Sequence, residues 1–231
     1  MKFKKTIAAV VTAAMMLTSA ATLSVSAARF TDISGHWAET TIIGLSDRGI
    51  VNGVSATEFN PNGTVTRAEF LKMTMEAMGI DTVTARNGEC LEVQTSDWYA
   101  PYLQSALDKG LIPENMIAGY KLEVKRQEDG TIKVHYSGAF NGYIPIMREE
   151  MAVIAQCMYQ YTRNANTMKN MKESSDLPFT DADDISGWAY EAVKLAYAQG
   201  FIDGMGDGTF APKAAMTRAE AATIISRMIN V

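Results

Sequence analysis

A four-residue phrase that recurs three times constrains the fold of this chain more than any other feature. Its copies are Thr66-Arg67-Ala68-Glu69, Met147-Arg148-Glu149-Glu150 and Thr217-Arg218-Ala219-Glu220, and each opens an apolar run. Upstream of each copy a tryptophan stands twelve residues before a glycine, in the pairs Trp37 and Gly49, Trp98 and Gly110, and Trp188 and Gly200. These repeated spacings predict one supersecondary unit used three times, because a lone pair of helices cannot bury its apolar face and neighbouring copies can.

Each copy is predicted to fold as two helices joined by a glycine-containing loop. Ile42, Leu45 and Ile50 follow the first tryptophan at helical spacing, and the other copies show the same pattern. The glycine after this helix accepts the left-handed conformation that follows a last turn. A second amphipathic helix begins at each arginine of the phrase. The expected fold is therefore mainly α, with copies at residues 28–80, 93–161 and 178–231, separated by linkers at 81–92 and 162–177.

The middle copy contains an insertion of about twenty residues. Ten residues separate the loop glycine from the next phenylalanine in the outer copies, whereas thirty separate Gly110 from Phe140. Within the insertion, apolar residues alternate with polar ones on both sides of Asp129-Gly130, a pair typical of tight turns. This pattern predicts a small β-hairpin at about residues 120–138, projecting from a loop.

The first 27 residues have the pattern of a secretory signal peptide. A basic start with three lysines precedes an uncharged stretch rich in Ala, Val, Met and Leu, and small residues near Ala27 offer a cleavage site. The alternative is a retained membrane anchor; after this segment no other apolar stretch of spanning length follows. Removing the three lysines moves the formal net charge from −5 to −8. We expect an exported chain that does not bind nucleic acid, since that affinity rests on Lys and Arg.

Few residues are suited to catalysis or to metal binding. The two histidines, His36 and His135, give little material for a zinc site or a histidine-based hydrolytic triad. Cys90 and Cys157 permit a single disulfide in an exported protein, but we expect no structural role for them. Cys157 stands where the other copies hold charged residues, which predicts a solvent-facing thiol. We therefore expect no enzyme activity, no metal and no cofactor.

Two functions are combined in the recurring phrase. Threonine and glutamate three residues apart form a capping box, which starts the second helix in the first and third copies. Capping does not explain the arginine, which faces the positive end of the helix dipole. Helix amides together with an arginine fork make a receptor for a carboxylate or a phosphate. The alternative is a surface arginine that pairs with a neighbouring carboxylate. The candidate anion-binding residues are Arg67, Arg148 and Arg218.

The tryptophans are candidates for contact with carbohydrate. Trp37, Trp98 and Trp188 each stand at the predicted start of a first helix. At such a place an aromatic ring either anchors the preceding loop or stacks on the apolar face of a sugar. Asp32 and Asp181 lie near the same helix starts, and taken alone they are expected to cap the helix or to complement its dipole.

The first and third copies resemble the S-layer homology (SLH) repeat in five short motifs that occur in order. In the first copy these are Phe30-Thr31-Asp32, His36-Trp37-Ala38, Gly49-Ile50-Val51-Asn52-Gly53, Phe59-Asn60-Pro61 and Thr66-Arg67-Ala68-Glu69. In the third copy they are Phe179-Thr180-Asp181, Gly187-Trp188-Ala189, Gly200-Phe201-Ile202-Asp203-Gly204, Phe210-Ala211-Pro212 and Thr217-Arg218-Ala219-Glu220. The resemblance covers nearly all of the chain after the signal segment, and three tandem copies are the usual number in this family.

The resemblance implies a wall-anchoring module whose three repeats form a pseudo-threefold helical assembly. In this family the grooves between repeats bind secondary cell-wall polysaccharide, commonly bearing pyruvate ketals, and an arginine can fork the ketal carboxylate. The glycan-binding residues implied are Asp32, Trp37, Gly53, Arg67, Trp98, Arg148, Asp181, Trp188, Gly204 and Arg218. The implied location is the cell wall or S-layer surface of a bacterium, where the chain binds this polysaccharide or a peptidoglycan-linked glycan.

The middle copy departs from the family pattern. Glu114 replaces the glycine found at Gly53 and Gly204, Gly142 replaces the proline, and Met147 replaces the capping threonine. We therefore expect the affinity of its groove to be lost or altered. The alternative function is an exported interaction or assembly module of the cell envelope that does not bind glycan directly. In that case an envelope protein partner contacts the inserted hairpin.

Overall fold

The structure is a computed structural model that describes residues 30–86, 89–163 and 176–230. The predicted signal peptide and most of the predicted linker at 162–177 lie outside this part of the chain. Its six α-helices are α1 (Glu39–Asp47), α2 (Arg67–Ala77), α3 (Ala100–Asp108), α4 (Arg148–Thr162), α6 (Gly187–Ala198) and α7 (Arg218–Ile229). Short 3-10 helices add η1 (Thr31–Ile33), η2 (Glu114–Met116) and η3 (Ala182–Asp184). The mainly α fold predicted from the sequence is confirmed.

The helices α2, α4 and α7 begin at the arginine of the recurring phrase, as predicted. At α2 the Glu69 amide donates to Thr66 Oγ1 at 3.2 Å, and the Thr66 amide donates to Glu69 Oε2 at 2.8 Å. The same two hydrogen bonds, at the same distances, start α7. Met147 has no hydroxyl to accept from the Glu150 amide. At α4 only the second bond of the pair is present, from the Met147 amide to Glu150 at 3.1 Å. The predicted capping boxes are therefore confirmed in the first and third copies.

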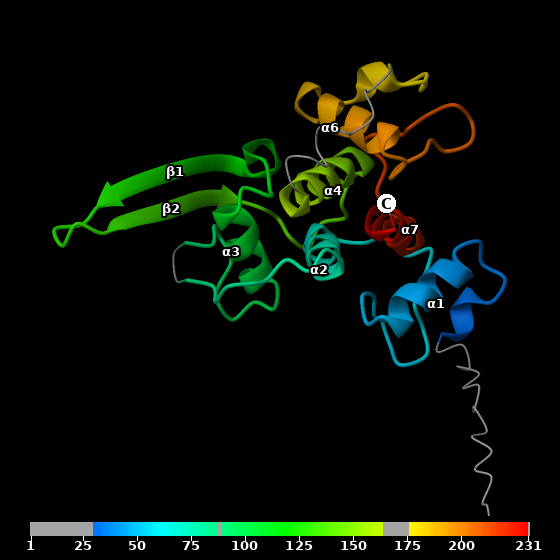
Figure 1. Cartoon of the computed structure of the whole chain (residues 1–231), viewed down its shortest axis with the longest axis horizontal. Helices are drawn as coiled ribbons and strands as arrows, with labels where there is room; N and C mark the ends of the chain where they lie inside the picture. The colour runs from blue at the N-terminus through cyan, green and yellow to red at the C-terminus, as the bar shows by residue number, and fades with distance from the viewer. Residues whose placement is uncertain (1–29, 87–88, 164–175, 231) are drawn as a thin grey trace, which may run out of the picture.

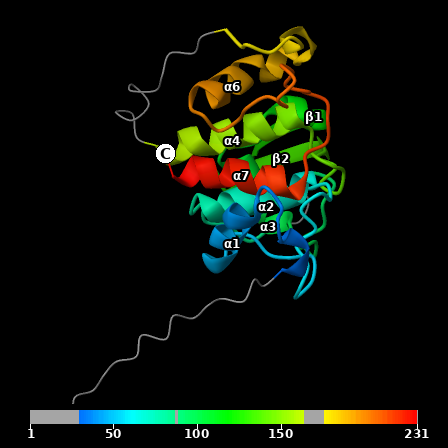
Figure 2. The same ribbon diagram turned by 90° about the vertical axis from the view of Figure 1, so that its right-hand side faces the viewer.

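The centre of the molecule is formed by α2, α4 and α7, which contact one another. Figure 2 shows these three helices side by side, with α1 and α6 outside them. Each outer helix packs on the central helix of another copy. The pairs are α3 on α2, α6 on α4, and α1 on α7 (Figure 1). The contact between α1 and α7 brings the two ends of the described chain together. The apolar faces of consecutive copies are thus buried against each other rather than within one copy.

A closed ring of backbone hydrogen bonds joins the segments that precede the central helices. The Val65 amide donates to the Met216 carbonyl, the Met216 amide to the Ile146 carbonyl, and the Ile146 amide to the Val65 carbonyl, each at 3.0 Å. The three side chains are fully buried. The ring fixes the start of each central helix relative to the other two.

The insertion forms the predicted hairpin, with strands β1 (Ala118–Arg126) and β2 (Ile132–Ala139). The strands pair antiparallel, with Val124 opposite Val134, and Gly130 in the turn has a φ of 83°. Figure 1 shows the hairpin extending away from the helices. Leu122, Val124 and Ile132 are exposed on it.

The glycine prediction is confirmed, and the prediction for one cysteine is wrong. Gly49, Gly110 and Gly200 follow α1, α3 and α6 with φ values of 71°, 65° and 77°, in the left-handed region. Cys90 is buried, and both cysteines are free. Cys157 is not solvent-facing but half-buried against the core, because α4 is packed between other helices.

Candidate functional site

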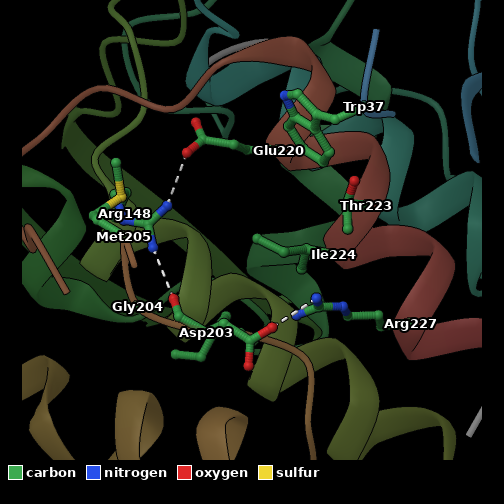
Figure 3. A pocket seen from close by; sticks show the side chains of 10 residues that line it. Trp37, Arg148, Asp203, Gly204, Met205, Glu220, Thr223, Ile224 and Arg227 are labelled. Atoms are coloured by element: carbon green, nitrogen blue, oxygen red, sulfur yellow. Dashed lines mark hydrogen bonds and ion pairs between the residues drawn. The ribbon is translucent and has the colours of Figure 1, made fainter. Parts of the chain in front are cut away.

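The first groove lies between the start of α1 and the loop that follows α6. We call it the Trp37 groove, and Figure 3 shows its side chains. Its lining consists of Trp37, Arg148, Ile202, Asp203, Gly204, Met205, Glu220, Thr223, Ile224 and Arg227. Trp37 is 66% exposed, so a large part of this residue is accessible to a ligand. The loop at Gly204 and the side chains of α7 form the other walls.

A second groove, the Trp98 groove, has an equivalent lining built from other parts of the chain. Its residues are Ile50, Asn52, Gly53, Val54, Glu69, Lys72, Met73, Trp98 and Arg218. Trp98 takes the place of Trp37, Arg218 that of Arg148, and Gly53 that of Gly204. Including space open to solvent, the grooves enclose about 640 and 700 Å³, so the two are similar in size.

Each of these tryptophans shares its groove with an arginine from another copy. Trp37 shares its groove with Arg148, and Trp98 shares its groove with Arg218. The middle copy thus contributes Arg148 to one groove and Trp98 to the other. The sequence placed a binding role on the first and third copies and treated the middle one as doubtful; in the structure, both grooves contain a side chain from it.

The groove arginines are buried and hold the glycine loops in place. Arg148 Nε donates to the Phe210 carbonyl at 2.7 Å, and its Nη2 donates to the Asp203 carbonyl at 3.0 Å. Arg218 donates in the same way to the carbonyls of Phe59 at 2.8 Å and Asn52 at 2.7 Å. The guanidinium groups therefore shape the wall that faces each tryptophan, in addition to placing a cation at the floor of the groove.

Each arginine also pairs with the capping glutamate of another copy. Arg148 lies 3.1 Å from Glu220, and Arg218 lies 3.6 Å from Glu69. Burial lowers the pKa of Arg148 and Arg218, while these carboxylates act in the opposite direction. Both guanidinium groups remain charged, because an arginine pKa is above 12 in water. The carboxylates are a second, negative component of each groove.

The third such pair, Arg67 with Glu150, is covered. Glu150 accepts from Arg67 Nε at 3.0 Å and from its Nη2, and Arg67 also donates to the carbonyls of Phe140 and Met116. The exposed fraction of the glutamate side chain is 5% here, against 22% for Glu220 and 38% for Glu69. The three arginine side chains are similarly buried, so this pair differs from the two groove pairs in its covered glutamate, and Arg67 joins separate parts of the protein.

Trp188 lines neither the Trp37 groove nor the Trp98 groove. It is half-buried against the core, whereas Trp37 and Trp98 are exposed. Buried Glu149 ties the start of α6 to α4 by accepting from the Ser186 amide at 2.9 Å and from Lys213 Nζ at 2.5 Å. The outer copies have alanine at this position, so the sequence alone gave no signal for this contact.

Asp32 and Asp181 each hold a turn, and neither lines the Trp37 groove or the Trp98 groove. Asp32 accepts from the amides of Phe59 at 2.8 Å and Asn60 at 2.6 Å. Asp181 binds the equivalent amides of the third copy at 2.7 and 2.8 Å. Burial tends to raise the pKa of Asp32, but these amides and the Arg218 charge lower it overall. The sequence predicted that these aspartates cap the first helix. In the structure they bind instead the loop that precedes the second helix.

Glu92 performs the same task in the middle copy, and the sequence reasoning missed it. Its carboxylate accepts from the amides of Phe140 at 3.1 Å and Asn141 at 3.0 Å. Asp97, which lies closer to the start of α3, accepts instead from the nearby Gln94 amide at 3.0 Å. An acid a few residues before each tryptophan was the available signal, with a spacing that varies between copies.

Gly53 and Gly204 are required by close packing in the loops that line the grooves. A Cβ on Gly53 would lie 2.4 Å from the Glu58 carbonyl oxygen and from a Phe30 ring carbon. On Gly204 it would lie 2.7 Å from the Thr209 carbonyl oxygen and 2.9 Å from Phe179. The glycines therefore allow each loop to pass over a buried phenylalanine.

Within residues 30–86, 89–163 and 176–230, no helix has the length and apolar character needed to cross a membrane. The same residues contain no cluster of three or more His, Cys, Asp or Glu side chains arranged to hold a metal ion.

Two segments of the chain match the S-layer homology domain. They are residues 29–71 and 178–222. The first contains Trp37 and Gly53, and the second contains Gly204 and Arg218; Trp98 and Arg148 lie outside both. Each groove thus combines an S-layer homology segment with a residue of the region between the two segments.

Curated relatives include large surface proteins and enzymes. The chain is 36% identical over 204 residues to the exoglucanase XynX of Acetivibrio thermocellus, covering 87% of this chain and 16% of that protein. It is 26% identical to the S-layer protein sap of Bacillus anthracis, covering 97% of this chain and 24% of that protein. A cellulosome-anchoring protein of A. thermocellus matches at 26% identity, covering 74% of this chain and 33% of that protein.

The chain spans less than a fifth of the first enzymes it matches, 16% of the exoglucanase and 9% of an amylopullulanase of Thermoanaerobacterium thermosulfurigenes. The S-layer homology segments and the surface-layer relatives indicate a secreted protein associated with the cell wall or S-layer.

Proposed function

We propose that this chain anchors to the bacterial cell wall by binding wall polysaccharide in the Trp37 and Trp98 grooves. The observation that carries the proposal is the equivalence of the two grooves, each with an exposed tryptophan facing a glycine loop and a buried arginine. We further propose that the chain contains three tandem repeats around a pseudo-threefold axis, the middle one degenerate. The closed hydrogen-bond ring and the three arginine–glutamate pairs support this arrangement.

The chemistry of each groove suits a sugar ring. An exposed indole face stacks on the apolar face of a pyranose, and the polar atoms of the facing loop bond its hydroxyl groups. A ketal-linked pyruvate adds a carboxylate, which a cationic group in the groove binds through charge-assisted hydrogen bonds. The protein contributes recognition in this account and no bond-breaking step. Arg67, Trp188, Asp32 and Asp181 would support the fold around the grooves without touching glycan.

Co-sedimentation with purified cell walls tests the proposal. We expect Trp37→Ala and Trp98→Ala each to weaken binding and the double variant to abolish it, while the circular dichroism spectrum stays unchanged. Tyr161→Ala is the matched control, because Tyr161 is a half-exposed aromatic of α4 outside both grooves. Full wall binding by the folded double variant would refute the assignment of the grooves.

The second candidate function is binding of an envelope protein through the hairpin. The exposed Leu122, Val124 and Ile132 side chains favour it. An isolated two-stranded hairpin is marginally stable, and a partner that covers such an apolar face would stabilise it. Replacing residues 120–138 by a short glycine-containing loop separates the candidates. Glycan anchoring predicts that wall binding survives this deletion, whereas anchoring through a protein partner predicts that it is lost and that purified polysaccharide is not bound.

A further inference from the structure

Tyr143 is an exposed aromatic residue that the proposed function does not use. It lies in the loop before α4 and is 61% exposed. Its ring packs edge-to-face on the ring of Tyr99, with the centroids 5.3 Å apart and the planes at 86°. Tyr99 is buried, and its ring also contacts that of Trp98, with centroids 5.4 Å apart. One buried ring therefore supports two exposed ones, Trp98 in its groove and Tyr143 outside the groove lining.

In every copy, the residue at the position of Tyr143 reaches the segment that carries the tryptophan. In the first copy, Asn62 bonds at 3.3 Å to His36, which directly precedes the tryptophan. In the third copy, Lys213 Nζ lies 2.6 Å from Ser186 Oγ, two residues before the tryptophan. The fold therefore puts this position beside a tryptophan each time, and only the middle copy fills it with an aromatic residue.

Two departures of the middle copy from the recurring pattern create the support for Tyr143. Tyr99 stands where the outer copies have alanine, directly after the tryptophan, and Gly142 stands where they have proline. A Cβ on Gly142 would lie 2.7 Å from two ring carbons of Tyr99 and 3.0 Å from its hydroxyl oxygen. A proline there would collide with the tyrosine ring, because buried side chains leave no spare room. The missing proline of this copy thus makes room for an aromatic ring.

An exposed ring with a fixed orientation is suited to stacking on a sugar. A side chain that a neighbour already holds in place loses little conformational freedom when a ligand binds. Its ring offers an apolar face, and its hydroxyl group can exchange hydrogen bonds with the sugar. Asn62, at the equivalent place beside Trp37, offers an amide and no such face. The surroundings of the two grooves therefore differ in aromatic surface.

We infer that Tyr143 is a second sugar platform outside the Trp98 groove, so that this site contacts a longer stretch of polysaccharide than the Trp37 groove does. One sugar stacks on Trp98, another sugar of the same chain stacks on Tyr143, and Tyr99 positions the Tyr143 ring. The inference rests on the proposed glycan binding and adds a subsite. This subsite lies outside both segments that match the S-layer homology domain.

Calorimetric titration of the Trp37→Ala variant, which leaves the Trp98 site, tests the inference. The titrant is a purified wall polysaccharide fragment several sugars long. We expect Tyr143→Asn, which introduces the residue of the first copy, to weaken binding about three- to tenfold, the size of one aromatic contact. Tyr143→Phe keeps the ring, so it should change binding less than about twofold.

Two controls and a direct measurement assign the loss to this subsite. Tyr161→Asn changes a half-exposed aromatic of α4 outside both grooves and should leave binding unchanged. Tyr143→Asn in the Trp98→Ala background should leave binding in the Trp37 groove unchanged. In nuclear magnetic resonance spectra of protein with isotope-labelled tyrosine, the ring signals of Tyr143 should shift when the fragment is added, and those of Tyr161 should not. A purely structural role of Tyr143 would not produce this shift.

The outcomes separate the subsite from the proposed function. Undiminished binding by Tyr143→Asn, an equal loss in Tyr143→Phe, or unshifted ring signals of Tyr143 would overturn the inference while leaving glycan binding in the grooves in place. A loss of the same size in the Trp37 groove would overturn it as well. If the wild-type chain does not bind the fragment, the proposed function itself fails.

Discussion

The three arginine–glutamate pairs predict a graded loss of stability when each glutamate is changed to glutamine. Glutamine serves in a capping box as glutamate does, so the substitution removes the charge and keeps the helix start. Glu150 is the most buried of the three and accepts two bonds from Arg67. Its replacement leaves the arginine charge buried without an opposite charge, which costs about 3–5 kcal/mol.

The other two positions provide internal controls. Glu220 is more exposed and lies 3.1 Å from Arg148, and Glu69 is the most exposed, 3.6 Å from Arg218. We expect about 1–2 kcal/mol for Glu220→Gln and less than about 1 kcal/mol for Glu69→Gln, as for exposed pairs. The same amino-acid change thus gives three sizes of effect, set by burial and distance.

Urea unfolding at pH 7, followed by far-ultraviolet circular dichroism, measures the series. The free energy of unfolding is compared at equal slope, since a changed slope would mean that the unfolded or native state has changed compactness. For a chain of this size, Glu150→Gln should lower the melting temperature by about 6–20 °C. A loss below about 1 kcal/mol for Glu150→Gln, or an equal loss at all three positions, would refute the reasoning.

Three further predictions concern the loops and the cysteines. Because its folded-state pKa is lowered, Asp32 stabilises the fold at neutral pH; the stability difference between wild type and Asp32→Asn should shrink as the pH falls below about 4, and a constant difference would contradict it. Ala211 has a φ of 55°, in the left-handed region that asparagine tolerates better than alanine, and Asn60 has a φ of 57° in the equivalent turn. Ala211→Asn should therefore raise the free energy of unfolding by about 0.5–1 kcal/mol in urea titrations. A decrease would show that the backbone at Ala211 is not strained. Burial raises the pKa of Cys90 to about 12 and also raises that of Cys157, so iodoacetamide at pH 8 should label both thiols only after unfolding, as mass spectrometry would record.

Local structure was largely predictable from the sequence. The capping boxes, the left-handed glycines and the alternation around Asp129-Gly130 depend on neighbouring residues, and the structure has the expected helices and hairpin at these places. Such features follow from backbone sterics and hydrogen bonds within a few residues, which a single sequence records.

The partners across copies were not predictable in the same way. No local pattern says that Trp37 shares a groove with Arg148, because that depends on α1 packing against α7 from the other end of the chain. Burial of Arg67 was missed for the same reason, since its partners Glu150, Phe140 and Met116 come from the middle copy. Residue spacing identified the candidate side chains, and the packing of the copies decides which of them line a groove.

The central claim is that two grooves bind wall glycan, and a stoichiometry measures it most directly. Native mass spectrometry of the chain with a defined wall polysaccharide fragment should give two fragments bound at saturation. Trp37→Ala and Trp98→Ala should each reduce this number to one. Three bound fragments in the wild type, or two in either variant, would contradict the account.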